Sequence, residues 1–336
     1  MTTVVYVANA DSHDLSVLRL DPASGAVTPQ ARVDAGGTVM PLAVSVDRRH
    51  LYASIRSEPL AVATFAVDPR DGNLSAVGRS PLPASSCWIG LDRSGRFLLS
   101  ASYGGSQVAV SPIDSEGVAG PARQALATAP NAHSIQTDPG NRFAFVACLG
   151  GDRVMAFRFD AASGALEALP EPAWRTRAGA GPRHFAFHPT APFVYLLNEL
   201  DATVDALEFH AETARFGHVQ TIDSMPPGVT GKPWAADLHF TPDGRFLYTS
   251  ERRSSTLAAF AVDAQDGGLK ALGTVETATE PRGFAIDASG RWLLAAGQAS
   301  NRLRVHAIDA ASGALSMHAE LEVGRNPNWV EIVELP

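Results

Sequence analysis

A repeat of about 46 residues runs through the chain and constrains its fold more than any other feature. Its first marker is an acidic turn after an apolar stretch, with the pattern Asp-x-x-x-Gly. Full copies occur at Asp21–Gly25, Asp68–Gly72, Asp160–Gly164, Asp263–Gly267 and Asp309–Gly313, and weaker ones start at Asp114 and His210. Successive copies are 47, 46, 46, 50, 53 and 46 residues apart. Such a period is typical of propellers and related repeat architectures.

A second marker has nearly the same period. It is an apolar stretch centred on a large side chain, found at Tyr6, Tyr52, Leu99, Phe145, Tyr195, Tyr248 and Leu294, with spacings of 46, 47, 46, 50, 53 and 46. Asp/Gly turns such as residues 241–245 often precede these stretches, so each unit is expected to hold four short antiparallel strands. Seven such units predict an all-β fold, a seven-bladed β-propeller with four antiparallel strands per blade.

The two ends of the chain predict how the ring closes. Residues Val4–Ala8 match the second strand of a blade, whereas Asn328–Val333 match a first strand. We expect the N- and C-terminal strands to share one blade, because this removes a free sheet edge. Residues 1–336 would then form a single domain without a linker.

The composition excludes several classes of protein. The 27 Lys and Arg against 35 Asp and Glu give a net charge of −8, which argues against nucleic-acid binding. No apolar run is long enough to cross a membrane. The first residues lack the features of a secretory signal, so we expect a cytoplasmic protein. We also expect a monomer or a weak homo-oligomer. Cys87 and Cys148 lie in apolar stretches and are expected to be buried free thiols.

Polar and aromatic residues gather where a propeller could carry chemistry. The first strand of a blade starts at the face where the second strand ends, so residues at both places ring one mouth of the central channel. Second strands end at Arg56, Tyr103, Leu149, Glu199, Arg252 and Gln298, and first strands start near Trp88, His133, Arg183, Asp237, Arg282 and Asn328. Arginines that meet in this way are costly to bury unless they pair or bind an anion.

Two interpretations of this cluster remain open on the sequence alone. In the first, ion pairs only stabilise the channel, and they would join Arg183, Arg252 and Arg282 to Glu199, Asp237 and Glu251. In the second, the mouth binds an anion and one carboxylate takes part in a reaction.

Two connections between blades stand out at the same mouth. The stretch 178–184 contains Gly179 and Gly181, whose N–H groups could turn toward an anion. A tight connection between blades is the alternative. The long connection Ser224–Lys232 could cover the mouth, or it could be a surface insertion.

Several chemistries lack their motifs. The chain has no Gly-x-Ser-x-Gly elbow, no His-Glu-x-x-His and no Cys-x-x-Cys. His184 and His188 are four residues apart, but on a strand this spacing does not present a helical metal pair. A lone histidine on an inner strand, such as His239, is more often a hydrogen-bonded core residue than a ligand. We therefore expect neither a metal site nor a cofactor.

Residues 179–189, Gly-Ala-Gly-Pro-Arg-His-Phe-Ala-Phe-His-Pro, and 195–200, Tyr-Leu-Leu-Asn-Glu-Leu, resemble the seven-bladed propeller lactonase family. Further similar segments are 234–239, 241–248, 250–252, 281–284 and 295–298. The resemblance extends from the first strand to Trp329. The family includes bacterial 6-phosphogluconolactonases and fungal 3-carboxy-cis,cis-muconate lactonising enzymes, and this chain is most similar to the bacterial branch.

The resemblance implies a catalytic set of His133, Arg183, Glu199 and Arg252, the positions that match the set proposed for the family. Trp88 departs from the bacterial branch, which tends to have a histidine there. A second departure is Ala132, which precedes His133 where a relative has a cysteine.

The resemblance also implies hydrolysis of a sugar lactone, with 6-phospho-D-glucono-1,5-lactone of the pentose phosphate pathway as the leading substrate. Lactone opening needs a base for water, and Glu199 is the expected base. Arg183 or Arg252 would stabilise the oxyanion, and His133 would orient the substrate or protonate the ring oxygen. The expected substrate-binding residues are Arg56, Tyr103, His184, Asp237, Arg282 and Gln298, of which Arg282 and Arg56 would hold the phosphate.

Two rival functions remain open. One is a different enzyme on the same site, either an unphosphorylated aldonolactonase or a carboxymuconate-type cycloisomerase. The other is a non-catalytic propeller that binds a partner, because this fold hosts many functions. The joint presence of Arg183, Glu199 and Arg252 argues against the second rival, since a scaffold needs none of them.

Overall fold

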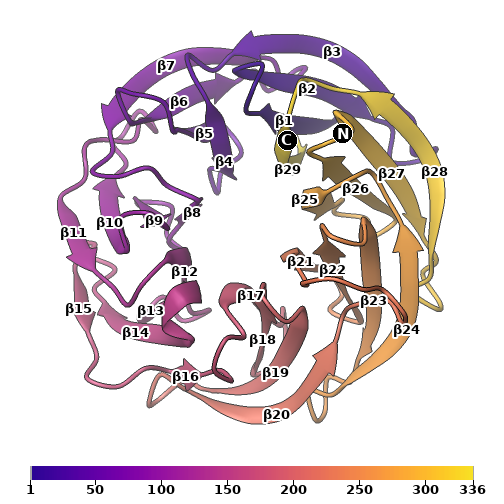
Figure 1. Ribbon diagram of the computed structural model, residues 1–336. Coiled ribbons are helices and arrows are strands. Elements are labelled where there is room, and N and C mark those ends of the chain that lie inside the picture. Colours follow the sequence, from indigo (N-terminus) through magenta and orange to yellow (C-terminus); the bar gives the residue numbers. More distant parts are fainter. Residues whose placement is uncertain (1, 336) are drawn as a thin grey trace.

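The chain forms a ring of seven β-sheets around a central channel in a computed structural model that describes residues 2–335 (Figure 1). Each sheet is a blade of antiparallel strands. In six of the blades the strands follow chain order from the channel outward, and in the remaining blade the C-terminal strand is innermost. Within the described residues, the remaining regular element is a 3₁₀ turn, Leu149–Gly151. The prediction of an all-β, seven-bladed propeller is confirmed.

The blades are numbered here from the one that contains the N-terminus, and strands are given from the channel outward. Blade 1 holds β29 (Pro327–Glu334), β1 (Thr3–Asn9), β2 (Asp14–Leu20) and β3 (Val27–Asp34), and blade 2 holds β4 (Val39–Val44), β5 (His50–Ile55), β6 (Ala61–Val67) and β7 (Leu74–Pro81). Blade 3 holds β8 (Trp88–Leu91), β9 (Phe97–Ser102), β10 (Gln107–Pro112) and β11 (Gln124–Ala127), and blade 4 holds β12 (Ala132–Thr137), β13 (Phe143–Cys148), β14 (Arg153–Phe159) and β15 (Leu166–Ala168). Blade 5 holds β17 (Pro182–Phe187), β18 (Phe193–Asn198), β19 (Thr203–His210) and β20 (Arg215–Asp223). Blade 6 holds β21 (Ala235–Phe240), β22 (Phe246–Glu251), β23 (Thr256–Val262) and β24 (Leu269–Glu276), and blade 7 holds β25 (Pro281–Ile286), β26 (Trp292–Gly297), β27 (Arg302–Ile308) and β28 (Leu315–Glu322).

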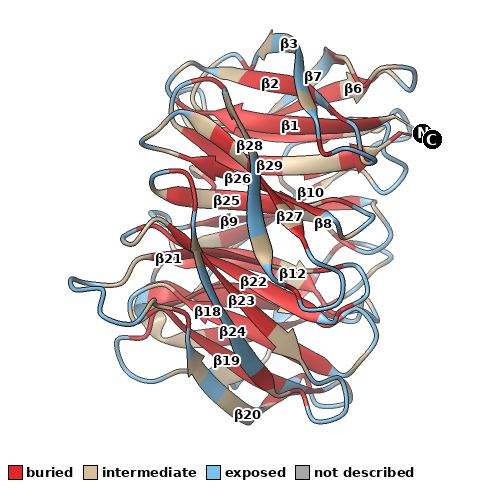
Figure 2. Ribbon diagram, turned by 90° about the vertical axis from the view of Figure 1, so that its right-hand side faces the viewer, coloured by how far each residue is buried: buried red, intermediate tan, exposed pale blue. Residues whose placement is uncertain are grey.

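Blade 1 closes the ring as the sequence predicted. The C-terminal strand β29 pairs antiparallel with the N-terminal strand β1, with Val4 opposite Val333 and Ala8 opposite Trp329. The two termini consequently lie side by side on one side of the ring (Figures 1 and 2). The pairing gives β1 a partner on each side, so it is not an edge strand.

The two repeat markers contact each other across blade boundaries. The tyrosine hydroxyl of a second strand donates to the carbonyl oxygen of the glycine that ends the Asp-x-x-x-Gly turn of the next blade. These bonds join Tyr6 to Gly72 at 2.7 Å, Tyr195 to Gly267 at 2.9 Å and Tyr248 to Gly313 at 2.8 Å. Since each marker recurs once per blade, both series have the same period.

Burial is lowest in the outermost strands (Figure 2). Strand β1 is buried along its whole length, whereas most residues of β3 and β24 are exposed. Cys87 and Cys148 are buried and free, as expected. No helix in the part of the chain that the structure describes is long and apolar enough to cross a membrane.

Blade 4 departs from the regular plan at its outer edge. A short strand, β16 (Trp174–Arg175), pairs with β14 next to β15, so the outermost strand is in two pieces. Pro170 and Pro172 lie between these pieces. Proline has no N–H to donate to a neighbouring strand, which explains why the strand is interrupted there.

Candidate active site

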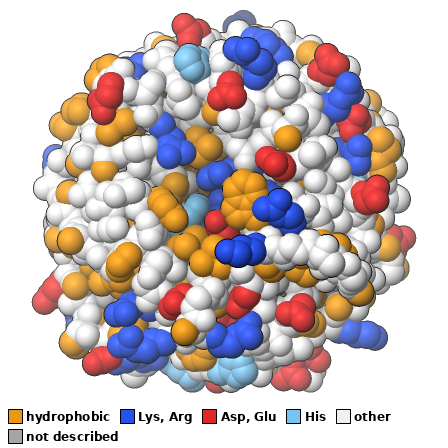
Figure 3. Space-filling view, in the orientation of Figure 1, with side chains coloured by type: hydrophobic (Ala, Val, Ile, Leu, Met, Phe, Trp, Pro, Cys, Tyr) orange, Lys and Arg blue, Asp and Glu red, His pale blue; other side chains and the backbone are white. Residues whose placement is uncertain are grey.

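The face of the ring at which the second strands end carries a hollow at its centre. Figure 3 shows Lys and Arg side chains gathered around this hollow beside hydrophobic and histidine side chains. The termini lie on the opposite side (Figure 2). A local concentration of cations in an acidic chain makes this mouth the candidate active site.

Bulges in the innermost strands place the key side chains. The register shifts between Ala132 and Ser134 in β12, between Pro182 and His184 in β17 and between Pro281 and Gly283 in β25. His133, Arg183 and Arg282 are therefore the extra residues. A bulge bends its strand and re-aims the side chain of the extra residue. The sequence placed these residues at the mouth but did not predict the bulges.

Glu199 joins two of the arginines. It directly follows β18, and its Oε2 atom lies 2.7 Å from Nε of Arg183 and 3.1 Å from an Nη atom of Arg252. Arg183 is 1% and Arg252 2% exposed. Backbone carbonyl groups hold their other nitrogens, because Arg183 donates to Ala236 and Arg252 donates to Trp234 and Ala235. Both guanidinium groups are thus fixed in position.

Trp234 completes the surroundings of Glu199, and the sequence analysis did not identify it as a site residue. Its indole N–H donates to Oε1 of Glu199 at 3.2 Å, and the Arg252 guanidinium carbon lies 3.9 Å from the ring centroid. A cation over an indole face is attracted by the ring quadrupole. The sequence does contain one signal for Trp234 as a site residue. It lies directly before β21, at the end of the long connection that follows β20.

The structure corrects the interpretation that three carboxylates neutralise three arginines. Glu251 accepts the backbone N–H groups of Trp234 and Ser254, each at 2.6 Å, and so fixes the chain on either side of Arg252. Asp237 contacts two histidines. Within residues 2–335, neither carboxylate pairs with an arginine, so Glu199 alone offsets the cluster.

The cluster therefore carries excess positive charge. No carboxylate of the described residues lies within 4.0 Å of the Arg282 guanidinium. Enclosure in the protein and the charge of Arg183 lower the pKa of Arg252 to about 8 and that of Arg282 to about 10. Both stay protonated at neutral pH but repel each other and Arg183, so a bound anion would relieve the repulsion.

His133 lies next to this cluster as a neutral imidazole. It is 4% exposed, and its Nδ1 atom has no hydrogen-bond partner among the described residues. Its ring centroid is 5.9 Å from that of Tyr103, which is 41% exposed, and 5.1 Å from that of His184. Burial, followed by the charge of Arg183, holds the pKa of His133 well below its usual value.

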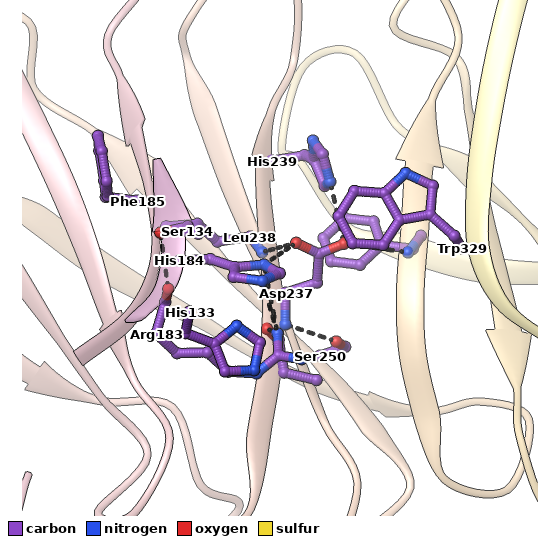
Figure 4. A network of polar contacts seen from close by, with 12 residues as sticks. His133, Ser134, Arg183, His184, Phe185, Asp237, Leu238, His239, Ser250 and Trp329 are labelled. Atoms are coloured by element: carbon purple, nitrogen blue, oxygen red, sulfur yellow. Dashed lines mark hydrogen bonds and ion pairs between the residues drawn. The ribbon is translucent and has the colours of Figure 1, made fainter. Parts of the chain in front are cut away.

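His184 and Asp237 lie behind Arg183 and are buried (Figure 4). His184 Nδ1 is 2.9 Å from Asp237 Oδ1. Trp88 packs edge-on against His184, with 4.6 Å between ring centroids, and against Trp329, at 5.3 Å. These two indoles lie beneath the polar mouth.

The remaining expected residues are half-buried or exposed. Arg56 donates from Nε to Ser85 at 2.9 Å, and Gln298 donates to Asn326 at 2.7 Å. The arrangement brings His133, Arg183, Glu199 and Arg252 together, with Tyr103 at the rim, while Gln298 is bound to its neighbour.

The glycine stretch before β17 does bind an anion, but the anion is a side chain of the protein. Gly179 and Gly181 have φ angles of 78° and 69°, and their N–H groups donate to the Asp152 carboxylate at 2.7 and 3.0 Å. These groups are consequently not free for a ligand, and the stretch is a tight connection between blades 4 and 5. No cluster of three His, Cys, Asp or Glu residues in the described chain could hold a metal ion.

Comparisons with known proteins give the family. The model of the family "Lactonase, 7-bladed beta-propeller" matches residues 2–332, and the chain belongs to this family. It is 41% identical over 335 residues, with complete coverage of both chains, to a Pectobacterium carotovorum protein named 6-phosphogluconolactonase. A Serratia proteamaculans protein with the same name is 41% identical over 99% of both chains. Among solved structures, the Pseudomonas aeruginosa periplasmic gluconolactonase covers all of the chain at 30% identity with a TM-score of 0.93.

Proposed function

We propose that this protein is a lactone hydrolase that converts 6-phospho-D-glucono-1,5-lactone and water into 6-phosphogluconate, a step of the pentose phosphate pathway. The observation that carries the proposal is the mouth itself, where three guanidinium groups face a single ion-paired carboxylate, Glu199. A substrate with a phosphate and a carbonyl that becomes an oxyanion fits that excess of positive charge. The names of the relatives at 41% identity agree with this substrate.

The arginines would supply most of the catalytic effect. When water attacks the lactone carbonyl, negative charge develops on the carbonyl oxygen. Arg183 and Arg252 are fixed by Glu199 and backbone carbonyl groups, so they need little reorganisation to receive that charge. Arg282, which lacks a carboxylate partner, is placed to hold the phosphate, and Arg56 supports it.

The contacts favour His133 for the role of base that the sequence assigned to Glu199. Glu199 already accepts three N–H groups, from Arg183, Arg252 and Trp234, which leaves its carboxylate few free lone pairs. His133 is neutral. Its Nδ1 atom is buried, so Nε2 is the nitrogen that would receive the proton. An anionic substrate would offset the arginine charges that depress the pKa of His133 and so make the imidazole a better base.

The reaction then balances with one shuttled proton. The imidazole of His133 takes a proton from the attacking water as the new carbon–oxygen bond forms. The bond between the carbonyl carbon and the ring oxygen breaks in the next step, and the imidazolium returns the proton to that oxygen. The carboxylic acid product ionises in solution, so each turnover releases one proton.

Proton release therefore tests the proposal directly. Freshly generated 6-phosphogluconolactone and gluconolactone would be compared at neutral pH, with the spontaneous rate of each subtracted. We expect saturable hydrolysis with a strong preference for the phosphorylated lactone. Rates no higher than the spontaneous ones on both substrates would reject the function.

A second candidate, an unphosphorylated aldonolactonase, is favoured by one observation. The Pseudomonas structure that matches the whole chain with a TM-score of 0.93 is named a gluconolactonase and is periplasmic. We favour the phosphorylated substrate because Arg282 has no carboxylate partner among the described residues, and we place the protein in the cytoplasm, where phosphorylated sugars are made. Equal rates on both lactones in the same assay would favour the second candidate.

A further inference from the structure

A chain of polar contacts starts at Arg183 and leads through the inner wall of the channel (Figure 4). An Nη atom of Arg183 lies 3.1 Å from Nε2 of His184, and Nδ1 of His184 lies 2.9 Å from Oδ1 of Asp237. The other oxygen of Asp237 lies 3.1 Å from Nε2 of His239. His184 is 1% and Asp237 4% exposed, so a role in direct contact with substrate does not account for them.

The partners of His184 select one tautomer. An ionised carboxylate only accepts, so Nδ1 must carry the hydrogen that is shared with Asp237. Nε2 then keeps its lone pair. An Arg183 nitrogen lies 3.1 Å from Nε2 and 3.2 Å from Nδ1, so the guanidinium packs against the face of the ring. The opposite tautomer would turn a lone pair toward the Asp237 carboxylate.

The charges of His184 and Asp237 agree with this tautomer. Burial, followed by the charge of Arg183, lowers the pKa of His184 to about 3, so the ring stays neutral and Nε2 stays an acceptor. Burial alone would raise the pKa of Asp237, but the charge of His239 and the imidazole hydrogen bonds outweigh it and hold that pKa well below its usual range. Asp237 is also anchored by the backbone N–H of Leu238 at 3.0 Å.

We propose that His184 and Asp237 are positioning residues for hydrolysis. Asp237 fixes the tautomer and ring orientation of His184, and His184 holds the guanidinium of Arg183 where the oxyanion forms. The effect on turnover rests on the proposed function, whereas the tautomer and the contact with Arg183 do not. Neighbours that orient a reactive group in this way are as necessary as the group itself, because a displacement of about 1 Å can cost about 100-fold in rate.

This chain of polar contacts ends at a second cavity, which the indoles of Trp88 and Trp329 help to line. This cavity has a volume of about 340 Å³, and Asp237, His239, Glu331, Trp88 and Trp329 line it. The His239 side chain is 42% exposed. Asp237 and Glu331 are the charged groups that face His239. The contact between His239 and Asp237 therefore supports the Asp237 carboxylate on the side away from His184.

The first test is Asp237→Asn. The amide lacks the negative charge that holds the hydrogen on Nδ1 of His184, so the ring is free to change tautomer and to turn beside Arg183. We expect kcat to fall about 10- to 100-fold with little change in KM, since a group used in the transition state is misplaced. Unchanged kcat in a folded Asp237→Asn protein would overturn the proposal.

A pair of variants at His184 separates positioning from packing. His184→Gln keeps one donor and one acceptor and should retain more of kcat than His184→Phe, which fills the space but keeps neither. His188→Gln is the matched control, because His188 follows the same strand but binds only the backbone around it, at Gly244, Thr190 and Ala191. Equal losses in the Gln and Phe variants at position 184 would contradict the role.

A measurement on the wild-type protein tests the proposal without a variant that has to fold and without an activity assay. Nitrogen NMR of the imidazole rings reports which ring nitrogen carries hydrogen. We expect His184 to be neutral with hydrogen on Nδ1 throughout the neutral pH range. Hydrogen on Nε2 would overturn the proposal even if the lactonase is active, and hydrogen on Nδ1 would uphold the contact even if no lactone is hydrolysed.

Discussion

The two ends of the central channel are built from the same inner strands but have opposite character. At one end, Arg183 and Arg252 pair with one carboxylate, Glu199, and Arg282 adds a third positive charge. At the other end, Asp237 and Glu331 face His239 in a cavity with apolar walls. Asp237 contacts both ends, because one of its oxygens binds His184 and the other binds His239.

The difference shows where a propeller can carry function. A bulge at the start of an inner strand turns a side chain toward the mouth, as at His133 and Arg183, and the regular pairing continues beyond it. Farther along, inner strands are tied to each other, as where Ser134 donates to the Arg183 carbonyl at 2.8 Å and Gln136 to that of Phe185 at 2.6 Å. Residues at the bulges can therefore be reactive, while residues beyond them hold the ring together.

The largest expected effect separates the two ends directly. Arg183→Met should lower kcat about 10²- to 10³-fold, because it removes a fixed donor to the oxyanion. Glu331→Gln, at the opposite end, should leave kcat within about 3-fold, as expected for a change remote from the reacting atoms. Initial rates of proton release on 6-phosphogluconolactone compare the two, and similar losses in both variants would contradict a site at the arginine end.

A smaller loss is expected when the arginines lose their anchor. Glu199→Gln should lower kcat about 10- to 100-fold, because two guanidinium groups then lack a counter-charge and shift. Trp234→Phe keeps a ring near Arg252 but removes the indole N–H, so its loss should be about 3- to 10-fold, near the net value of one typical hydrogen bond. A full loss in Glu199→Gln with complete retention of folding would instead support Glu199 as the base.

The effect of an Arg282 substitution should depend on the substrate, which makes the comparison sharper. Arg282→Gln should raise KM for the phosphorylated lactone about 10- to 100-fold, as expected for loss of a charge-assisted contact. The KM for gluconolactone should hardly change. Steady-state kinetics on both lactones measure this, and an equal rise for both would show that Arg282 does not select the phosphate.

The smallest effect is on stability at the opposite end. Enclosure raises the pKa of Glu331 to about 7, so the folded protein holds a proton there that the unfolded chain loses at lower pH. Wild-type stability should therefore fall as pH rises from about 4.5 to about 7, and Glu331→Gln should lack this fall. Thermal unfolding should show the variant more stable by about 1–3 °C at pH 8, with little difference at pH 4.5. A lower melting temperature of the variant at pH 8 would contradict the assignment.

The sequence predicted the blades because their signals are local and repeated. Each Asp-x-x-x-Gly turn and each central tyrosine lies at a fixed place in its unit, and contacts such as Tyr248 to Gly313 repeat around the ring. The positions of His133, Arg183, Glu199 and Arg252 followed from the same register. The sequence did not predict which side chains pair with each other. Pairing depends on side-chain directions, which are set by bulges and by residues far apart in the chain.

Two particular contacts show this limit. Gly179 and Gly181 have the backbone needed to bind an anion, but only the fold shows that Asp152 occupies their N–H groups. Glu251 is next to Arg252 in the sequence, yet successive residues of an extended chain point to opposite sides, and the Glu251 carboxylate binds the backbone of Trp234. Charge counts along a sequence therefore indicate a charged site but do not assign its pairs.

A crystal structure with 6-phosphogluconate tests the central claim most directly. The product carries both the carboxylate formed by the reaction and the phosphate that we expect to be recognised. We predict that the carboxylate lies between Arg183 and Arg252, within reach of His133, and that the phosphate contacts Arg282. Product bound in the cavity of His239 and Glu331, or a phosphate directed away from Arg282, would contradict the account.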